Sequence, residues 1–207
     1  PMKHDEWIAH IKTLGGERKY VEPAKGTVNP RVFIDRLAKK MPANVTVVAD
    51  VGQNQIWTCT EYKFRKEGRL LTSGGMGTMG YSVPAAIGAK MADNSRATVA
   101  ICGDGAFQMS FMELATAVQF GVDIKVVVMT NNRLGMVREL QTNGYHDRQT
   151  AVFLDGSPDF IKLAEAYGIP AMRVYDDDTM DNGIEMLAEH KGICLVEVVV
   201  DKDMPTL

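Results

Sequence analysis

Residues 97–132 read ATVAICGDGAFQMSFMELATAVQFGVDIKVVVMTNN, and this stretch decides the fold. It begins with one apolar run, Ala97 to Cys102, and ends with another, Ile124 to Met129. Continuous apolar runs of this kind are typical of strands buried on both faces of a parallel sheet. Gly121 should end a helix between them. That helix is indicated by four residues at helical spacing: Phe107, Phe111, Leu114 and Val118.

The same alternation of strand and helix covers most of the chain. Further strands are expected at residues 45–49, 70–73, 171–174 and 193–200. Further helices are expected at residues 54–62, 82–91, 136–142, 159–167 and 179–190, and one opens at Asn29-Pro30, with Asn as its cap and Pro in its first turn. The pattern predicts an α/β fold, a three-layer sandwich with a mostly parallel central sheet of about six strands and helices on both faces.

The division into domains follows from composition. Gly15-Gly16 and Pro23 interrupt a short amphipathic stretch near the start of the chain. We therefore expect residues 1–25 to be a linker from a preceding domain that these 207 residues do not include, and residues 26–207 to form one domain with a full core.

Composition also excludes several classes of protein. The net charge of −3 argues against a broad nucleic-acid surface. No apolar stretch reaches the roughly 18 residues of a membrane span. The three cysteines, Cys59, Cys102 and Cys194, fit no metal-ligand spacing, and the last two lie in apolar runs. Buried free thiols suit a reducing compartment, so a cytoplasmic location is expected.

Small, flexible or oxygen-bearing residues follow four of the predicted strands. In a sheet of this class, ligands bind beyond the carboxyl ends of the strands. A random domain would not usually carry such residues at four strand ends. The four segments are residues 50–55 (DVGQNQ), 73–80 (SGGMGTMG), 103–106 (GDGA) and 130–133 (TNNR).

Two of these segments together predict a site for magnesium and a diphosphate. Asp104 offers a carboxylate, and Asn131 or Asn132 offers an amide oxygen at the end of the next strand. Both are ligands of the kind that Mg²⁺ takes, and Mg²⁺ usually adds phosphate oxygens and water. The glycines beside Asp104 allow close approach of the backbone. The helix that begins near Ala106 directs its N-terminal N–H groups toward the same place.

The motifs resemble those of thiamine-diphosphate enzymes, and within them the large subunit of acetolactate synthase. Gly103-Asp104-Gly105 followed by Asn131-Asn132 is similar to the signature of the superfamily. The closer resemblance covers roughly residues 26–200 and rests on residues 50–55 and 73–80 together with residues 84–89 (PAAIGA) and 135–138 (GMVR).

This resemblance implies a transferase of branched-chain amino acid biosynthesis. Thiamine diphosphate and Mg²⁺ would decarboxylate pyruvate and join the two-carbon unit to a second 2-oxo acid, giving acetolactate. FAD is expected in the full-length family, but not bound by this segment. A glutamate on a separate pyrimidine-binding domain, supplied by a neighbouring subunit, promotes catalysis in the family. We find no candidate for that domain here, so we expect this chain alone to be inactive.

The resemblance also implies which residues hold the cofactor. Val51, Gly52, Gln53 and Asn54 should bind the diphosphate. The family commonly has His where Asn54 stands, and Asn keeps a donor but lacks the ring and its charge. The remaining residues implied to contact the cofactor are Gly77 and Met79 near the pyrimidine and thiazolium, Met136 as the better candidate at the bend of the cofactor, and Gly103, Asp104, Gly105, Ala106, Asn131, Arg133 and Gly135.

The metal ligands can be aligned in two registers. The gap-free alignment gives Asp104, the side chain of Asn131 and the backbone carbonyl of Arg133. The other register gives Asn132 with the carbonyl of Leu134. Neighbouring side chains on an extended segment point to opposite sides, so only one asparagine can ligate the metal.

The substrate pocket is expected to involve Met136, Val137 and Leu140. Many biosynthetic members of the family have Trp where Leu140 stands, and Leu makes a smaller, non-planar wall. We therefore expect weaker selection for 2-oxobutyrate over pyruvate; the alternative is that Leu140 is only a packing residue. The expected partners are small 2-oxo acids, a homodimer or tetramer of the chain's own kind and a regulatory subunit, but neither nucleic acid nor membrane.

Three alternative functions are weighed beside this one. Residues 75–80 fit the pattern G-x-G-x-x-G of dinucleotide-binding proteins, although a single match is weak evidence. Another thiamine-diphosphate decarboxylase or carboligase would share the cofactor residues. The third alternative is a cofactor-binding module without catalytic activity.

Overall fold

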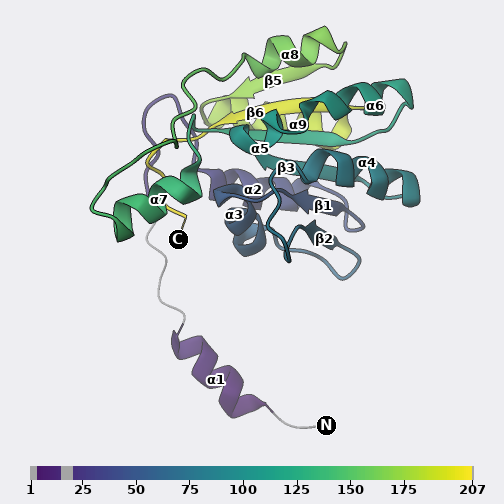
Figure 1. Ribbon diagram of the computed structural model, residues 1–207. Helices are drawn as coiled ribbons and strands as arrows, with labels where there is room; N and C mark the ends of the chain where they lie inside the picture. The colour runs from purple at the N-terminus through teal and green to yellow at the C-terminus, as the bar shows by residue number, and fades with distance from the viewer. Residues whose placement is uncertain (1–3, 15–20, 207) are drawn as a thin grey trace.

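All six strands of the computed structural model form one parallel sheet, in the order β2-β1-β3-β4-β6-β5 (Figure 1). The structure describes residues 4–14 and 21–206. β3 and β4 are the central pair, and nearly every residue in them is buried. The strands are β1 (Thr46–Ala49), β2 (Arg69–Thr72), β3 (Thr98–Gly103), β4 (Lys125–Thr130), β5 (Ala171–Val174) and β6 (Cys194–Val199). The prediction of a mostly parallel sheet is confirmed.

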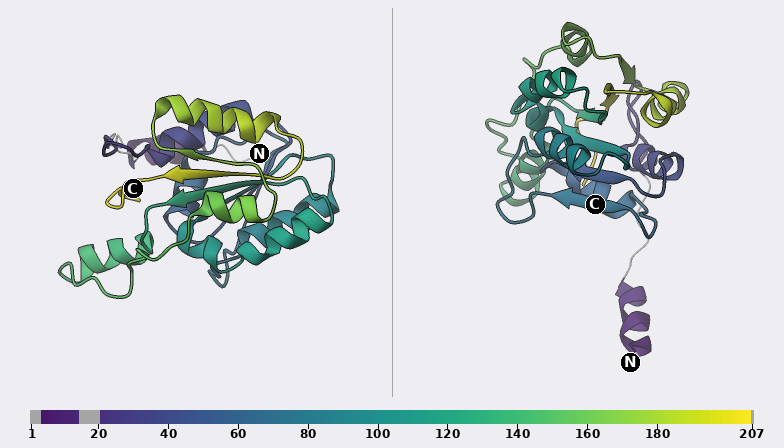
Figure 2. Two further views of the ribbon diagram at one scale, coloured as in Figure 1. Left: turned by 90° about the horizontal axis from the view of Figure 1, so that it is seen from above. Right: turned by 90° about the vertical axis from the view of Figure 1, so that its right-hand side faces the viewer.

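Helices cover both faces of the sheet, which gives the three predicted layers (Figure 2). One face packs against α2 (Pro30–Lys40), α3 (Gln53–Glu61) and α9 (Asp177–Glu189), whose buried residues share one apolar cluster with the sheet. The other face packs against α4 (Ser82–Ala92), α5 (Asp104–Gln108), α6 (Leu114–Gln119) and α8 (Phe160–Ala166). α7 (Gly135–Gly144) lies beyond the end of the sheet (Figure 1).

The predicted start of α2 is confirmed. The side-chain oxygen of Asn29 accepts hydrogen bonds from the backbone N–H groups of Arg31 and Val32, at 2.9 and 3.4 Å. Proline has no N–H to donate, but N–H groups in the first turn have no partner within the helix, so proline costs no hydrogen bond there. Asn29 also donates to the carbonyl of Val21 at 2.9 Å, which fixes the segment before the helix.

The helix predicted across residues 107–118 is broken. Residues after α5 leave the α-helical path at Ser110, whose φ and ψ are −145° and 8°, and continue through a 3₁₀ turn, η1 (Phe111–Glu113), into α6. The loop before α4 packs at this break, where a Cβ added at Gly80 would lie 3.0 Å from that of Met109. The prediction of one continuous helix was therefore wrong, because the chain leaves the helical path at Ser110, beside the place where the loop before α4 packs.

The N-terminal segment contains α1 (Asp5–Leu14), none of whose residues is buried. Gly15-Gly16 lies outside the described residues. Val28 pairs with Val200 beside β6, so the packed domain includes the residues just before α2. The boundary between residues 25 and 26 stays a prediction. Within the described ranges, no helix has the length and apolar character needed to cross a bilayer.

The order of the strands defines where a ligand should bind. β1 is followed along the chain by β2 on one side, whereas β3 lies on its other side. In parallel sheets the crevice at such a change of direction, beyond the carboxyl ends of the strands, is the usual ligand site. The end of β1 and the end of β3 are therefore the first place to look for a site.

Candidate functional site

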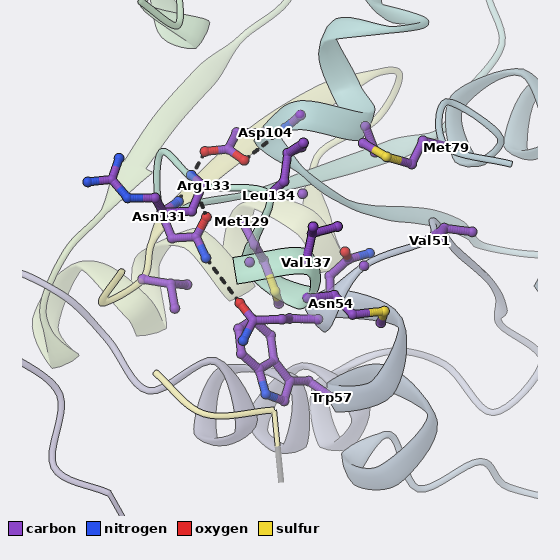
Figure 3. Close-up of a pocket in the computed structure, with 18 residues that line it drawn as sticks. Val51, Asn54, Trp57, Met79, Asp104, Met129, Asn131, Arg133, Leu134 and Val137 are labelled. Carbon is purple, nitrogen blue, oxygen red and sulfur yellow. Dashed lines mark hydrogen bonds between the residues drawn. The ribbon is translucent and has the colours of Figure 1, made fainter. Parts of the chain in front are cut away.

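A cavity of about 100 Å³ lies at this change of direction, beyond the carboxyl ends of β1, β3 and β4 (Figure 3). Loops after the three strands and the first turns of α3, α5 and α7 supply its wall. The lining residues are Val51, Gly52, Gln53, Asn54, Trp57, Met79, Gly103, Asp104, Gly105, Ala106, Met129, Asn131, Arg133, Leu134, Gly135, Met136, Val137 and Val200.

The cavity brings together nearly all of the residues named from the sequence. Gly77, Asn132 and Leu140 are the exceptions, since none of them lines it. Gly77 lies in the loop between β2 and α4 with φ of 63°, and Leu140 is 61% exposed on α7. Trp57, Met129 and Val200 line the cavity but carried no signal in the sequence beyond the apolar periodicity of their elements.

Asp104 is a buried carboxylate held by backbone N–H groups. Its side chain accepts from Gly105 at 2.8 Å, from Asn132 at 2.6 Å and from Asn131 at 3.2 Å. A carboxylate has roughly four lone-pair positions, so one remains for a further ligand. Burial raises the pKa of Asp104 to about 6, and the backbone hydrogen bonds act in the opposite direction.

No basic side chain in the described part of the chain pairs with Asp104. Arg133 lies nearby, but its guanidinium donates to Asp155 at 2.7 Å and stacks over the ring of Phe153 at 4.7 Å. A buried carboxylate without a positive partner is costly, and a bound cation would supply that charge. The described residues contain no group of three or more His, Cys, Asp or Glu side chains that could hold a metal. The carboxylate and amide oxygens therefore fit Mg²⁺ only if phosphate oxygens complete its coordination.

The side chain of Asn131 faces the cavity from the end of β4 (Figure 3). Its oxygen accepts from the backbone N–H of Arg133 at 3.1 Å, and its nitrogen donates to the side-chain oxygen of Gln53 at 3.2 Å. Asn132 takes a positive φ of 53° and contributes its backbone N–H to Asp104. The two asparagines thus have different positions relative to the cavity.

Three helices begin at the cavity without a side-chain cap. Gly52 precedes α3, Gly103 precedes α5 and Leu134 precedes α7, and none of these residues makes a capping hydrogen bond through its side chain. The first N–H groups of such helices lack partners within the helix and favour an anion. The arrangement suits a diphosphate held by backbone groups.

Glycine is required at positions 52 and 135, because neighbouring side chains lie where a Cβ would be. Gly52 has φ of 144°, and a Cβ there would lie 2.7 Å from Oδ1 of Asn54. At Gly135 a Cβ would lie only 1.9 Å from Oε1 of Gln53. Any side chain at position 135 would displace Gln53 and the first turn of α7 from the wall of the cavity.

The side-chain nitrogens of Gln53 and Asn54 donate to backbone carbonyls, so they do not take the expected role of binding a diphosphate. The Asn54 nitrogen donates to the carbonyls of Asp50 and Ile101, at 2.9 and 3.2 Å, so it has no N–H left for a phosphate. The Gln53 nitrogen donates to the carbonyl of Met204 at 3.0 Å. The backbone N–H groups of these two residues are their remaining means of binding an anion.

Asp50 is a residue of the site that the sequence did not single out. It is fully buried and accepts from the backbone N–H groups of Val51, Gly80 and Ser82, at 2.8, 3.0 and 2.8 Å. It thereby ties the glycine-rich loop to the end of β1 and places Met79 at the cavity. Its place in the segment 50–55, directly after a buried strand, was the available signal.

Comparison with known proteins identifies the family of this domain. Residues 50–198 match the family described as "Thiamine pyrophosphate enzyme, C-terminal TPP binding domain". The chain belongs to this family. Thiamine pyrophosphate is another name for thiamine diphosphate, so the C-terminal TPP-binding domain accounts for the cofactor inferred from the sequence.

Several acetolactate synthases are similar to this TPP-binding domain. The large subunit from Lactococcus lactis is 38% identical over 96% of the chain, which covers 34% of that relative. The mitochondrial catalytic subunit from Saccharomyces cerevisiae is 37% identical over 100% of the chain and 31% of the relative. The isozyme 2 large subunit from Escherichia coli is 32% identical over 98% of the chain and 37% of the relative. The chain thus spans about a third of the length of these relatives.

Proposed function

We propose that this chain is the cofactor-binding part of an acetolactate synthase large subunit, which decarboxylates pyruvate and joins the two-carbon unit to a second 2-oxo acid. The observation that carries the proposal is the buried carboxylate of Asp104, which shares a cavity with Asn131 and pairs with no basic side chain among the described residues. Similarity to acetolactate synthases along nearly the whole chain supports the reaction.

The metal would be held by Asp104, Asn131 and the backbone carbonyl of Arg133. This register is supported by the lining of the cavity, which includes Asn131 and Arg133 but not Asn132. Asn132 instead directs its backbone N–H to Asp104 at 2.6 Å. Mg²⁺ would offset the buried negative charge, and phosphate oxygens and water would supply its remaining ligands.

The diphosphate would be held mainly by backbone groups. Val51, Gly52, Gln53 and Asn54 line one wall, where α3 begins, and α7 begins at the opposite wall. Gly103, Gly105, Ala106 and Gly135 keep the walls free of bulk, so the phosphates can approach the backbone. The side chains of Gln53 and Asn54 would support the wall rather than bind phosphate.

Met79 and Met136 would border the ring system of the cofactor. Both line the cavity, and Val137 lies beside them on the first turn of α7. Bound thiamine diphosphate supplies the electron sink for decarboxylation. The chain's own residues fix the phosphate end, orient the rings and give the 2-oxo acid an apolar surface. Gly77 and Leu140 lie outside the cavity and would act only when other parts of the enzyme cover it.

The remaining parts of the enzyme would come from outside this chain. We propose that a pyrimidine-binding domain of a neighbouring subunit supplies the glutamate, in a homodimer or tetramer. The similarity to proteins named as large or catalytic subunits supports a separate regulatory subunit. FAD would bind to another domain of the full-length enzyme. A cytoplasmic location stays a prediction, since the yeast relative is named as mitochondrial.

Calorimetry of the purified chain tests the proposal. Thiamine diphosphate should bind in the presence of Mg²⁺ and lose its affinity when the ion is chelated. Asp104→Ala should abolish the Mg²⁺-dependent part of binding, because it removes the only carboxylate in the cavity wall. Asp178→Ala, on the exposed surface of α9, is the matched control and should bind normally. Binding that is equal with and without Asp104 would refute the proposed metal site.

A further inference from the structure

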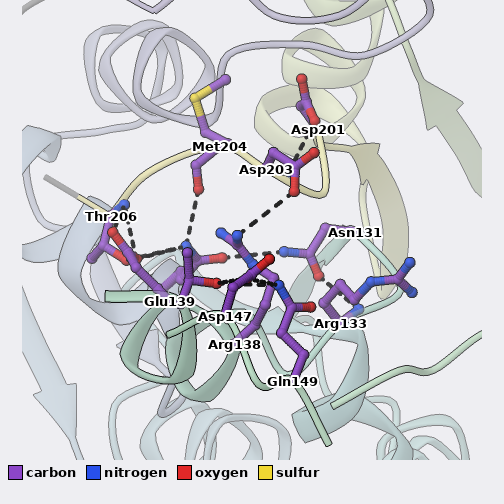
Figure 4. Close-up of polar contacts among 12 residues, drawn as sticks. Asn131, Arg133, Arg138, Glu139, Asp147, Gln149, Asp201, Asp203, Met204 and Thr206 are labelled. Atoms are coloured by element: carbon purple, nitrogen blue, oxygen red, sulfur yellow. Dashed lines mark hydrogen bonds and ion pairs between the residues drawn. The ribbon is translucent and has the colours of Figure 1, made fainter. Parts of the chain in front are cut away.

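The end of the chain folds back onto α3 and α7 beside the cavity (Figure 4). The indole N–H of Trp57 donates to the carbonyl of Pro205 at 3.1 Å. Arg138 pairs with Asp203 at 3.6 Å, and Arg31 donates to the carbonyl of Thr206 at 2.9 Å. Contacts from three helices thus hold residues 203–206, which we call the C-terminal strap.

Glu139 joins α7 to the C-terminal strap. Its carboxylate accepts from the backbone N–H of Thr206 at 3.1 and 3.2 Å, and also from the hydroxyl of Thr206. The same carboxylate accepts from the side-chain nitrogen of Gln53 at 3.1 Å. Gln53 and Thr206 are 4% and 6% exposed, so these hydrogen bonds are shielded from water.

The polarity of these partners determines how the Gln53 amide is turned. A carboxylate and a peptide carbonyl can only accept hydrogen bonds. Nε2 of Gln53 faces Glu139 and also the carbonyl of Met204 at 3.0 Å. Oε1 must therefore face the other way, where it accepts from Nδ2 of Asn131 at 3.2 Å. Close contact with Gly135 keeps Gln53 in this position.

The orientation of Gln53 in turn fixes that of Asn131. Since Oε1 of Gln53 can only accept, it binds the nitrogen of the Asn131 amide. The oxygen of Asn131 is then directed to the opposite side, where it accepts from the backbone N–H of Arg133 at 3.1 Å. The amide oxygen can ligate a magnesium ion, whereas the amide nitrogen cannot.

We propose that Glu139, together with Thr206, is a positioning residue that orients the Asn131 carboxamide through Gln53, so that its oxygen is presented to the cation. This inference rests on the proposed function, since it assumes that Asn131 ligates the metal. Partners beyond the ligands themselves typically change metal affinity by about 10–100-fold when they are removed. The C-terminal strap and the metal site are thus coupled through one chain of hydrogen bonds.

The test compares two variants of this chain of hydrogen bonds with a surface control. Glu139→Gln keeps the shape of the side chain but can also donate, so only the carbonyl of Met204 is left to dictate the orientation of Gln53. Thr206→Val removes the hydroxyl that Glu139 and Gln53 share. Each should weaken Mg²⁺-dependent binding of thiamine diphosphate about tenfold in calorimetry. Glu165→Gln, on the exposed side of α8, makes the same change of charge and should leave affinity unaltered.

A second measurement needs no ligand. In nuclear magnetic resonance spectra of the ligand-free chain, the side-chain NH₂ groups of Gln53 and Asn131 should exchange slowly with water. Glu139→Gln and Thr206→Val should speed that exchange, whereas Glu165→Gln should not. Weaker binding without any change at these two amides would show a general structural effect and would overturn the positioning role.

The two measurements separate the possible failures. If an enzyme that contains this domain does not bind thiamine diphosphate with Mg²⁺, the proposed function fails, and the role of Glu139 in positioning a metal ligand fails with it. If the unmodified chain binds but both variants bind as tightly as Glu165→Gln, only the positioning role is overturned. Loss of affinity together with faster exchange at Gln53 and Asn131 is the expected result.

Discussion

Asp50 and Asp104 follow neighbouring buried strands, and both carboxylates are almost fully buried, at 0% and 1% exposure. Their partners differ. Asp50 is enclosed by backbone N–H groups from its own strand end and from the glycine-rich loop. Asp104 borders the cavity, and burial raises its pKa to about 6. The first carboxylate organises the loop, and the second is placed to receive a cation.

The sequence identified Asp104 but not Asp50 for a physical reason. Asp104 lies between two glycines and pairs with a second oxygen-bearing segment, which together form a recognisable pattern. The role of Asp50 depends on the path of a loop about 30 residues further along the chain, and loop paths follow from tertiary packing rather than local preference. Local pattern can therefore suggest a ligand, but rarely the residue that supports the loop around it.

Asp50→Ala should lower the free energy of unfolding by on the order of 3 kcal/mol, because it leaves buried N–H groups of Gly80 and Ser82 without an acceptor. The loop should loosen and Met79 should leave its place at the cavity. Urea denaturation followed by circular dichroism measures the loss. Asp178→Ala, on the surface of α9, is the control. An unchanged denaturation midpoint for Asp50→Ala would show that the loop is held by other contacts.

Most elements could be predicted from apolar periodicity, because each presents one face or both faces to a core. The strand expected at residues 124–129 is β4 (Lys125–Thr130), and the helix expected from Asn29-Pro30 is α2. The break at Ser110 has no signal in the local pattern, and it lies where Gly80 of a distant loop packs against Met109. Local pattern thus gives the type of an element, whereas contacts between distant segments decide where it bends.

α7 carries the residue expected to influence substrate choice. Val137 lines the cavity, but Leu140, one turn further along, is 61% exposed and lies outside it. An exposed leucine on a helix that stands beyond the sheet is available to border a substrate only when another domain closes over α7. The role of Leu140 in selection therefore stays a prediction for the assembled enzyme.

Leu140→Trp should raise the preference for 2-oxobutyrate over pyruvate by up to about tenfold, because a planar ring offers more apolar contact to one additional methylene. The assay is competition between the two 2-oxo acids in an enzyme that contains this domain. Leu163→Trp, on α8 away from the cavity, is the comparison. An unchanged product ratio would indicate that Leu140 serves only in packing.

At the scale of the whole molecule, three distant segments meet at the cavity wall. Gln53 on α3, Glu139 on α7 and Thr206 in the C-terminal strap share hydrogen bonds across 86 and 153 positions of sequence. No short motif contains all three, so the sequence could not reveal this arrangement. Most residues expected to hold the cofactor line the cavity, and many of them follow directly after a strand, whereas the C-terminal strap owes its place to tertiary folding.

The size and chemistry of the cavity predict that the chain alone forms no acetolactate. Its volume of about 100 Å³ is small beside the roughly 300–1,000 Å³ usual for sites that enclose a small molecule. Among the described residues, Asp104 is the only acidic side chain in the lining, and the proposed function assigns it to the metal. We therefore expect a second protein surface to cover the rings of the cofactor and to supply the acid that promotes catalysis.

A chimera tests this prediction. This chain can replace the matching third of the Lactococcus lactis large subunit, since the two sequences are 38% identical over 199 residues. With pyruvate, Mg²⁺ and thiamine diphosphate, the chimera should form acetolactate, whereas the isolated chain and an Asp104→Ala chimera should form none. Product from the isolated chain would contradict the need for a second domain. A folded, cofactor-loaded chimera that releases acetaldehyde alone would instead indicate a decarboxylase without carboligation.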